Sequence, residues 1–168
     1  EKTNDRRTIK TKKAICRAFA ELLVEKELHK ITVKEIIEKA DISRVTFYNH
    51  YLDVYDLHDK FEESIMLEIA SLVLELESLP YSEVFSKIIS YVDENRTAFR
   101  MIFSPNGTNK MRFRLGTLLE GLLRQLYLEE NEGTADRNVD YMIYYRAQGM
   151  ILVLQKWVLD DFKEPADV

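Results

Sequence analysis

Apolar residues recur along most of the chain at the three- and four-residue spacing of amphipathic helices. Residues 8–27 show this spacing most clearly, with one predicted buried stripe at Ile15, Ala18, Phe19, Leu22 and Leu23. The same spacing predicts a long helix from Asp53 that ends before Pro80, and further helices at 82–94, 96–103, 110–130 and 136–162. Because five glycines and three prolines supply too few turns for a β-sandwich or barrel, the predicted fold class is all-α.

Two short helices are predicted between the first helix and the long one. Thr32 is placed to cap the first of them, and Glu35 completes a capping box three residues later. Ser43 is the N-cap candidate of the second, which covers about 43–49, and Asp41-Ile42 interrupts the pattern between them. Two short helices joined by a tight turn describe a helix-turn-helix. Three small helices of an ordinary bundle would give the same apolar spacing.

The second short helix carries polar residues where a recognition helix needs them. Its outward positions are predicted to be Arg44, Thr46, Tyr48 and Asn49, while either Val45 or Phe47 packs inward. Exposed side chains of this kind reach base edges and phosphates in DNA-binding helices. The pattern therefore favours a nucleic-acid-facing surface at this helix.

Charge is distributed unevenly along the chain. The formal net charge is −5, but residues 1–58 hold twelve Lys and Arg against ten Asp and Glu, and residues 59–168 hold twelve against nineteen. The first seventeen residues alone hold seven basic and two acidic side chains. Such asymmetry is a sign of a module that faces nucleic acid. A solvated, frayed N-terminal arm would give the same charges.

The chain lacks the residue patterns of most enzymes and metal sites. Its single cysteine, Cys16, permits no intramolecular disulfide and fits a cytoplasmic location. The histidines form no metal-ligand spacing, and no glycine-rich phosphate loop or serine nucleophile elbow is present. We therefore expect no metal, no cofactor and no enzymatic activity. No 18-residue run is free of charge, so no membrane-spanning helix is expected.

The stretch from Ile31 to Tyr51 resembles the DNA-binding region of TetR/AcrR-family regulators. The signature consists of Ile42-Ser43, Thr46-Phe47-Tyr48, His50-Tyr51 and Leu57, and the match covers about 8–58. The ending, from Tyr144 through Gly149 to Lys156-Trp157, is similar to a branch that includes regulators of dihydroxyacetone kinase operons. The rest of the chain matches that family only in its helical outline.

The resemblance implies a helix-turn-helix DNA-binding domain at residues 1–52 and a helical effector-binding and dimerisation domain at 53–168. It implies a homodimer that binds a palindromic operator, most often as a repressor, and a small-molecule effector. The residues that match DNA-contact positions, or lie beside them on the two short helices, are Thr32, Lys34, Ser43, Arg44, Val45, Thr46, Tyr48, Asn49 and His50.

Two further sets of residues are candidates in the second domain. The expected linings of an effector pocket are Phe61, Ile65, Phe85, Ile89, Phe99, Phe103, Phe113 and Tyr145. These aromatic and aliphatic residues favour an apolar or amphiphilic effector, whereas Arg96, Arg112 and Arg146 leave an anionic one open. The two long apolar helices at the end of the chain predict a subunit interface, with Leu119, Leu123, Met150 and Leu154 as its candidate residues.

This chain departs from the family pattern at two positions. Asp41 stands where the family usually has glycine, and aspartate tolerates left-handed backbone better than most residues. Val54 stands where the family usually has a lysine that neutralises a phosphate. The loss of that lysine and the acidic net charge keep a second interpretation open, a co-regulator or protein-interaction module with weakened DNA binding.

Overall fold

The computed structural model describes residues 2–107, 109–131 and 137–166, which form helices and connecting turns without a strand. The elements are α1 (Lys2–Glu25), a 3-10 turn η1 (Leu28–Lys30), α2 (Val33–Ala40), α3 (Arg44–Tyr48), α4 (Val54–Leu76), α5 (Tyr81–Glu94), α6 (Arg96–Phe103), α7 (Asn109–Glu130) and α8 (Val139–Leu159). The predicted all-α fold class is confirmed. None of the helices in the described ranges is both long and apolar enough to cross a membrane.

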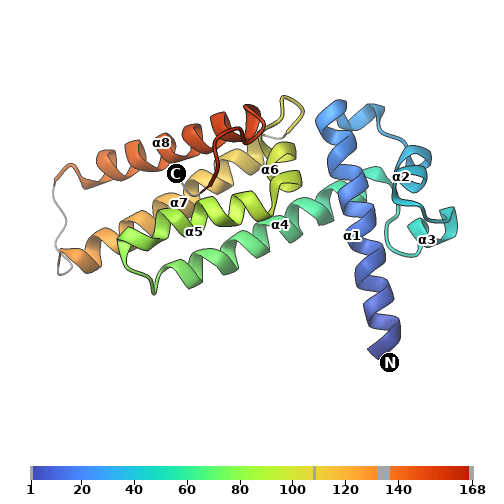
Figure 1. Ribbon diagram of the computed structural model, residues 1–168, viewed down its shortest axis with the longest axis horizontal. Helices are drawn as coiled ribbons and strands as arrows, with labels where there is room; N and C mark the ends of the chain where they lie inside the picture. The colour runs from blue at the N-terminus through green and yellow to red at the C-terminus, as the bar shows by residue number, and fades with distance from the viewer. Residues whose placement is uncertain (1, 108, 132–136, 167–168) are drawn as a thin grey trace.

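Helices α1, α2 and α3 form a head at one end of an elongated body (Figure 1). Helix α4 begins in this head and runs into the body, where it lies with α5, α6, α7 and α8 (Figure 1). Helices α2 and α3 lie on the side of α1 that faces away from α8 (Figure 1). The two short helices are therefore presented at the end of the molecule, clear of the body.

One hydrophobic cluster joins the head to the body. Ile15 and Phe19 of α1 are fully buried in the same cluster as Met101 and Ile102 of α6. The ring of Phe19 also meets His58 of α4 edge-on, with 6.1 Å between ring centroids. A second cluster lies farther out, between α4, α5, α7 and α8. Since α6 shares the cluster of α1, a displacement of α6 is expected to reach the head.

Several boundaries differ from the predicted ones for physical reasons. Helix α1 begins at Lys2 rather than at residue 8, so the basic N-terminal residues are helical rather than frayed. Asn95 does not cap α6 with its side chain and instead donates a 2.8 Å hydrogen bond to the carbonyl oxygen of Tyr91. The predicted C-terminal cap of the penultimate helix, Gly133, lies outside the described residues.

The last helix ends at Leu159, three residues before the predicted end, because the backbone turns. Asp161 and Phe162 have φ angles of 61° and 55°, a left-handed conformation that no α-helix can contain. The turn buries the ring of Phe162, which lies 4.9 Å from the Trp157 ring between centroids. The guanidinium groups of Arg96 and Arg100 cover the same ring at 4.6 and 5.3 Å, which ties the end of α8 to α6.

The connection from α6 to α7 is built around Gly107 and Arg112. The Arg112 guanidinium donates hydrogen bonds to the carbonyl oxygens of Ile102, Ser104 and Gly107 at 3.2 to 3.4 Å. A Cβ atom at residue 107 would lie 2.4 Å from the carbonyl oxygen of Ile102, closer than such atoms approach. The backbone is therefore packed too tightly here for any side chain.

We expect Gly107→Ala to lower the free energy of unfolding by about 1–3 kcal/mol, since backbone rather than a flexible side chain must move. Gly121→Ala is the matched control, because nothing lies within 4 Å of the added methyl group in the middle of α7. That control should gain about 0.5–1 kcal/mol from helix propensity. Urea denaturation of both variants measures the two effects, and an unchanged or raised stability of Gly107→Ala would contradict the tight packing.

Candidate nucleic-acid interface

The start of α2 is fixed by a complete capping box. The Thr32 hydroxyl accepts a 3.3 Å hydrogen bond from the backbone N–H of Glu35, and the Thr32 N–H donates a 3.0 Å bond to the Glu35 carboxylate. The ammonium group of Lys26 and the two Thr32 donors lower the pKa of Glu35 to about 2. The carboxylate is therefore ionised at neutral pH, and the predicted capping box is confirmed.

The turn between α2 and α3 depends on Asp41. Its φ of 51° and ψ of 53° place it in the left-handed region, where the family usually has glycine. Asp41 and Ile42 donate their backbone N–H groups to the carbonyl oxygens of Glu38 and Ile37. The prediction that aspartate would tolerate this turn is confirmed, and the turn has the hydrogen bonds that a helix C-terminus needs.

Helix α3 is short and is anchored by one capping residue and one buried ring. The Ser43 hydroxyl accepts a 3.1 Å hydrogen bond from the Thr46 N–H, which confirms the predicted cap. Phe47 is fully buried, whereas the Val45 side chain is 70% exposed. The inward residue left open between Val45 and Phe47 is thus Phe47. An exposed valine on such a short helix is costly in water and suits contact with another apolar group.

The outward surface of α3 carries a guanidinium and a phenol side by side. Arg44 is exposed, and its guanidinium lies 5.7 Å from the centroid of the Tyr48 ring. The Tyr48 ring is held in turn by an edge contact with Phe47, at 5.5 Å between centroids. Tyr48 is 46% exposed, so its side chain is accessible to a binding partner. The Thr46 hydroxyl bonds to Ser43 at 2.8 Å and is half-buried.

The structure brings the predicted DNA-binding residues together on two adjacent helices. All nine lie within the segment 32–50, on α2 and α3 and in the residues that flank them. Seven have exposed side chains, namely Thr32, Lys34, Ser43, Arg44, Val45, Tyr48 and Asn49. Thr46 and His50 are half-buried, and the His50 ring lies 6.2 Å from that of Tyr51.

Packing explains why a valine, Val54, stands where the family usually has a lysine. Val54 is buried at the start of α4 and belongs to the cluster that includes Phe47 and Leu57. Its neighbour Tyr55 is 56% exposed. Sequence reasoning did not select Tyr55, because nothing in the apolar spacing separates an outward tyrosine from a core one. Its exposed phenol can donate a hydrogen bond directly beside Val54, whereas the neighbour on the other side, Asp53, is an acceptor that caps α4.

Cys16 of α1 is half-buried and packs against the main hydrophobic cluster. Its Sγ lies 3.7 Å from the buried hydroxyl of Tyr51, and burial raises the pKa of the thiol. Burial likewise raises the pKa of Tyr51. A thiol with a raised pKa is a poor nucleophile, so these surroundings suit a packing residue rather than a reactive one. No three His, Cys, Asp or Glu side chains in the described ranges are placed to hold a metal ion.

An apolar cavity of about 60 Å³ lies in the body. Its lining comes from α4, α5, α6, α7 and α8 and consists of Ile69, Leu72, Val73, Leu76, Ile88, Tyr91, Val92, Phe99, Phe103, Leu115, Leu118, Leu119, Leu122, Ile151 and Leu154. Two of the eight expected pocket residues, Phe99 and Phe103, are among them. Arg96, Arg112 and Arg146 are not, so no charged side chain lines the cavity.

The other six expected pocket residues lie elsewhere. Phe85, Phe113 and Tyr145 are exposed on the surface and do not line this cavity. Each was selected by its aromatic character alone, which does not show the face of a helix that carries it. Ile65 is buried in the main cluster, and Phe61 and Ile89 pack against that cluster outside the cavity.

The four expected interface residues also lie inside the protomer. Leu119, Leu123 and Leu154 are buried in its core, and Met150 packs against the outer cluster. Leu119 and Leu154 even line the cavity. Leu119, Leu123 and Leu154 are therefore not exposed on the surface of the chain, whereas Met150 is half-buried. The apolar spacing of α7 and α8 correctly marks a buried stripe, but that stripe faces the protomer's own helices.

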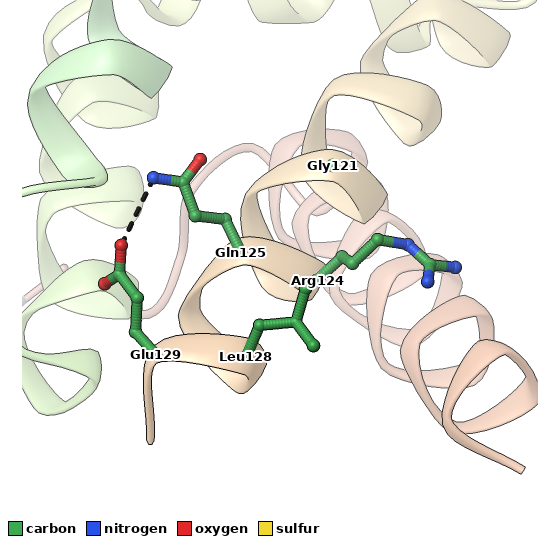
Figure 2. Close-up of a pocket in the computed structure, with 5 residues that line it drawn as sticks. All are labelled: Gly121, Arg124, Gln125, Leu128 and Glu129. Carbon is green, nitrogen blue, oxygen red and sulfur yellow. Dashed lines mark hydrogen bonds between the residues drawn. The ribbon is translucent and has the colours of Figure 1, made fainter. Parts of the chain in front are cut away.

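A larger hollow of about 430 Å³ lies on the outer face of α7 (Figure 2). Its lining comes from this one helix and consists of Gly121, Arg124, Gln125, Leu128 and Glu129. The Gln125 amide donates a 3.3 Å hydrogen bond to the Glu129 carboxylate across one helical turn (Figure 2). Because no second element encloses the hollow, it is part of the open surface of α7 rather than a ligand pocket.

Comparison with known proteins matches the chain to transcriptional regulators. A 121-residue stretch is 29% identical to the HTH-type dhaKLM operon transcriptional activator DhaS of Lactococcus lactis, covering 66% of this chain and 65% of that protein. A 58-residue stretch is 41% identical to the uncharacterized HTH-type transcriptional regulator YxbF of Bacillus subtilis, covering 34% of this chain and 15% of that protein. The matches thus span less than two thirds of either relative.

Solved structures show the same fold. A dihydroxyacetone kinase operon activator DhaS superposes with a TM-score of 0.60 at 21% identity, over 90% of this chain and 85% of that one. A TetR transcriptional regulator from Streptococcus agalactiae gives 0.57 at 25% identity, over 93% and 86%. The TetR-type family model described as "Transcriptional regulator C-terminal region" matches residues 81–168, more than half of the chain. The chain therefore belongs to the TetR family of transcriptional regulators, which are not enzymes.

Proposed function

We propose that this regulator binds a palindromic DNA operator as a homodimer and responds to a small apolar effector. The observation that carries the proposal is the capped pair α2 and α3, which exposes Arg44, Val45 and Tyr48 at the end of the molecule. In the major groove, a guanidinium can donate to guanine or phosphate, and a valine can contact a thymine methyl group. We assign the DNA-binding domain to residues 1–52 and the effector and dimerisation domain to 53–168.

The sign of regulation depends on where the operator lies. We propose repression where the operator overlaps a promoter, because bound protein then excludes the polymerase. The relative DhaS is named an activator, so either sign is compatible with this fold. The sign is measured as the expression of a reporter gene placed behind an operator selected from random duplexes, with and without the regulator. Reduced expression supports repression, and raised expression contradicts it.

The outer face of α8 is the surface we assign to the second subunit. Six residues follow one another at alternating four- and three-residue steps, namely Tyr141, Tyr145, Gln148, Leu152, Gln155 and Leu159. This is the spacing of a coiled-coil seam. Tyr145 is 78% exposed and Leu152 62%, and Tyr141 and Leu159 extend the same exposed apolar stripe, a kind of surface that marks interaction sites. A symmetric contact along this stripe would bury them.

The apolar cavity is the site we assign to an effector. It holds about 60 Å³, room for only a few water molecules, whereas ligand pockets usually measure about 300–1,000 Å³. A ligand must therefore displace side chains, and Phe99 and Phe103 of α6 are among those that it would meet. Because α6 shares the cluster of α1, that displacement supplies a route from ligand to head. The Tyr91 hydroxyl is the one polar side-chain group in the lining.

Val73 lines the cavity and is half-buried. We expect Val73→Phe to weaken the binding of an uncharged fluorescent probe, N-phenyl-1-naphthylamine, at least tenfold, because the added ring takes the space that the probe needs. Leu74→Phe is the control, since the neighbouring Leu74 side chain points to solvent. Fluorescence titration measures both affinities. Equal affinities for the two variants would show that the probe binds elsewhere.

The DNA-binding proposal is tested with a pool of random 40-base-pair duplexes. We expect the folded protein to bind these duplexes at low salt, with two chains bound per duplex. The affinity should fall steeply as salt is added. Fluorescence anisotropy with a stoichiometric titration reads out both quantities. Absence of binding at low salt by a folded dimer would contradict the proposal.

A further inference from the structure

Basic side chains form a stripe along the solvent face of α1. Arg6, Lys10, Lys13 and Arg17 follow one another at steps of four, three and four residues, so they project from one side of the helix. The buried residues of α1, such as Ile15 and Phe19, lie on the opposite side. The stripe therefore points away from the core of the head.

The part of α1 that carries most of this stripe is not held by the core. None of the side chains of residues 6–13 is buried, and Ile9 is 47% exposed. In Figure 1 the N-terminal half of α1 extends well past α2 and α3. This segment is defined here as the arm, residues 6–13. It gains little stability from tertiary packing.

Three charges of the stripe also lack ion-pair partners among the side chains that the structure describes. Among the described side chains, no carboxylate forms an ion pair with Arg6, Lys10 or Lys13, whereas Arg17 at the end of the stripe pairs with Glu21 at 3.0 Å. Like charges three and four residues apart destabilise a helix. The arm thus carries an electrostatic cost that an external polyanion would remove.

We propose that the arm binds the DNA backbone beyond the recognition helix, with Arg6, Lys10 and Lys13 each neutralising a phosphate. This inference rests on the proposed DNA-binding function and extends its footprint. From residue 6 to residue 13 the helix rises about 10 Å, about three base-pair steps of duplex at 3.4 Å each, so the three cations can reach different phosphates. The contacts compensate for the lysine replaced by the buried Val54.

A membrane surface fits the arm less well than DNA does. A helix that lies in a bilayer interface needs a broad apolar face opposite its cations. In residues 6–13 the one large apolar side chain is Ile9. Threonine and further basic residues occupy the other positions, so the arm has charge complementarity to a polyanion without the apolar area for insertion.

Two variants with the same change of charge test the stripe. Lys10→Gln/Lys13→Gln removes two cations from it, and Arg7→Gln/Lys12→Gln removes two from other faces of the same arm. The slope of log affinity against log salt on the random 40-base-pair pool should decrease in magnitude by about 0.9 for each lost phosphate contact. We expect a decrease of about 1.8 per subunit for the first variant and much less for the second. Circular dichroism confirms that both are folded.

Equal slopes for the two variants, or no change in either, would overturn the proposal. So would a selective loss of binding to phosphatidylserine vesicles with unchanged DNA slopes, which would assign the stripe to a membrane. The recognition-helix variant Thr46→Ala/Tyr48→Phe should keep the slope contribution of the arm. A wild-type protein that binds no duplex at all would instead refute the underlying DNA-binding function.

Discussion

The double variant Thr46→Ala/Tyr48→Phe is expected to lose operator affinity by about 1000-fold while it remains a folded dimer. Each subunit loses two hydroxyl donors, so the dimer loses four contacts of about 1 kcal/mol each. The fold should survive because Ser43 caps α3 through the backbone N–H of residue 46, which alanine retains. The aromatic ring at residue 48 keeps its contacts with Phe47 and Arg44. The loss is measured by fluorescence anisotropy titration of an operator selected from a random duplex library.

The same two kinds of substitution in the body provide the control. Thr117→Ala/Tyr127→Phe removes one threonine and one tyrosine hydroxyl from α7, far from the head. This variant should bind the operator like the wild type. If both double variants bound equally well, the assignment of α3 as the recognition helix would be wrong.

Tyr145→Glu/Leu152→Glu is expected to convert the dimer into monomers and thereby to abolish operator binding at nanomolar concentrations. Both side chains are exposed on the protomer, so the substitutions should leave its fold intact. In a symmetric contact they would place four carboxylates along one seam, where like charges repel strongly. The molecular mass measured by sedimentation at micromolar concentration should fall from about twice the 19.8 kDa chain mass to that mass itself.

Val153→Glu is the matched control for the interface. Val153 is 59% exposed, like Leu152, but it lies one residue farther along α8 and thus off the stripe. It should remain dimeric. A dimer that survives the double substitution, or one that Val153→Glu dissociates, would place the interface on another face.

The helices of the head could be predicted from the sequence because residues close together in the chain determine their ends. The caps at Thr32 and Ser43 each form the predicted side-chain bond to the backbone, and Asp53 caps α4 in the same way. A capping bond needs only residues three positions apart, so no knowledge of the fold is required to predict it. The left-handed turn at Asp41 is local in the same sense. The candidate DNA-binding residues therefore lie together as predicted, since a single short segment carries all of them.

The packing of the body helices could not be predicted in the same way, because these helices are apolar on more than one side. In α8 the residues from Met150 to Leu154 are all apolar, so the period alone does not show which stripe packs inside the protomer. The structure places Leu154 in the core and leaves Leu152 exposed. Most of the expected pocket residues lie outside the cavity for a related reason. The cavity lies between five helices, and the rotations of these helices depend on contacts distant in sequence.

Sequencing of the duplexes that the protein selects from a random library tests the central claim most directly. We predict an enriched inverted repeat whose half-sites lie about 10–10.5 base pairs apart, centre to centre, or a multiple of that spacing. Such a repeat would show that two recognition helices read DNA in a symmetric dimer. A folded dimer that enriches no sequence, even at low salt, would contradict the account and favour a co-regulator that acts through another protein.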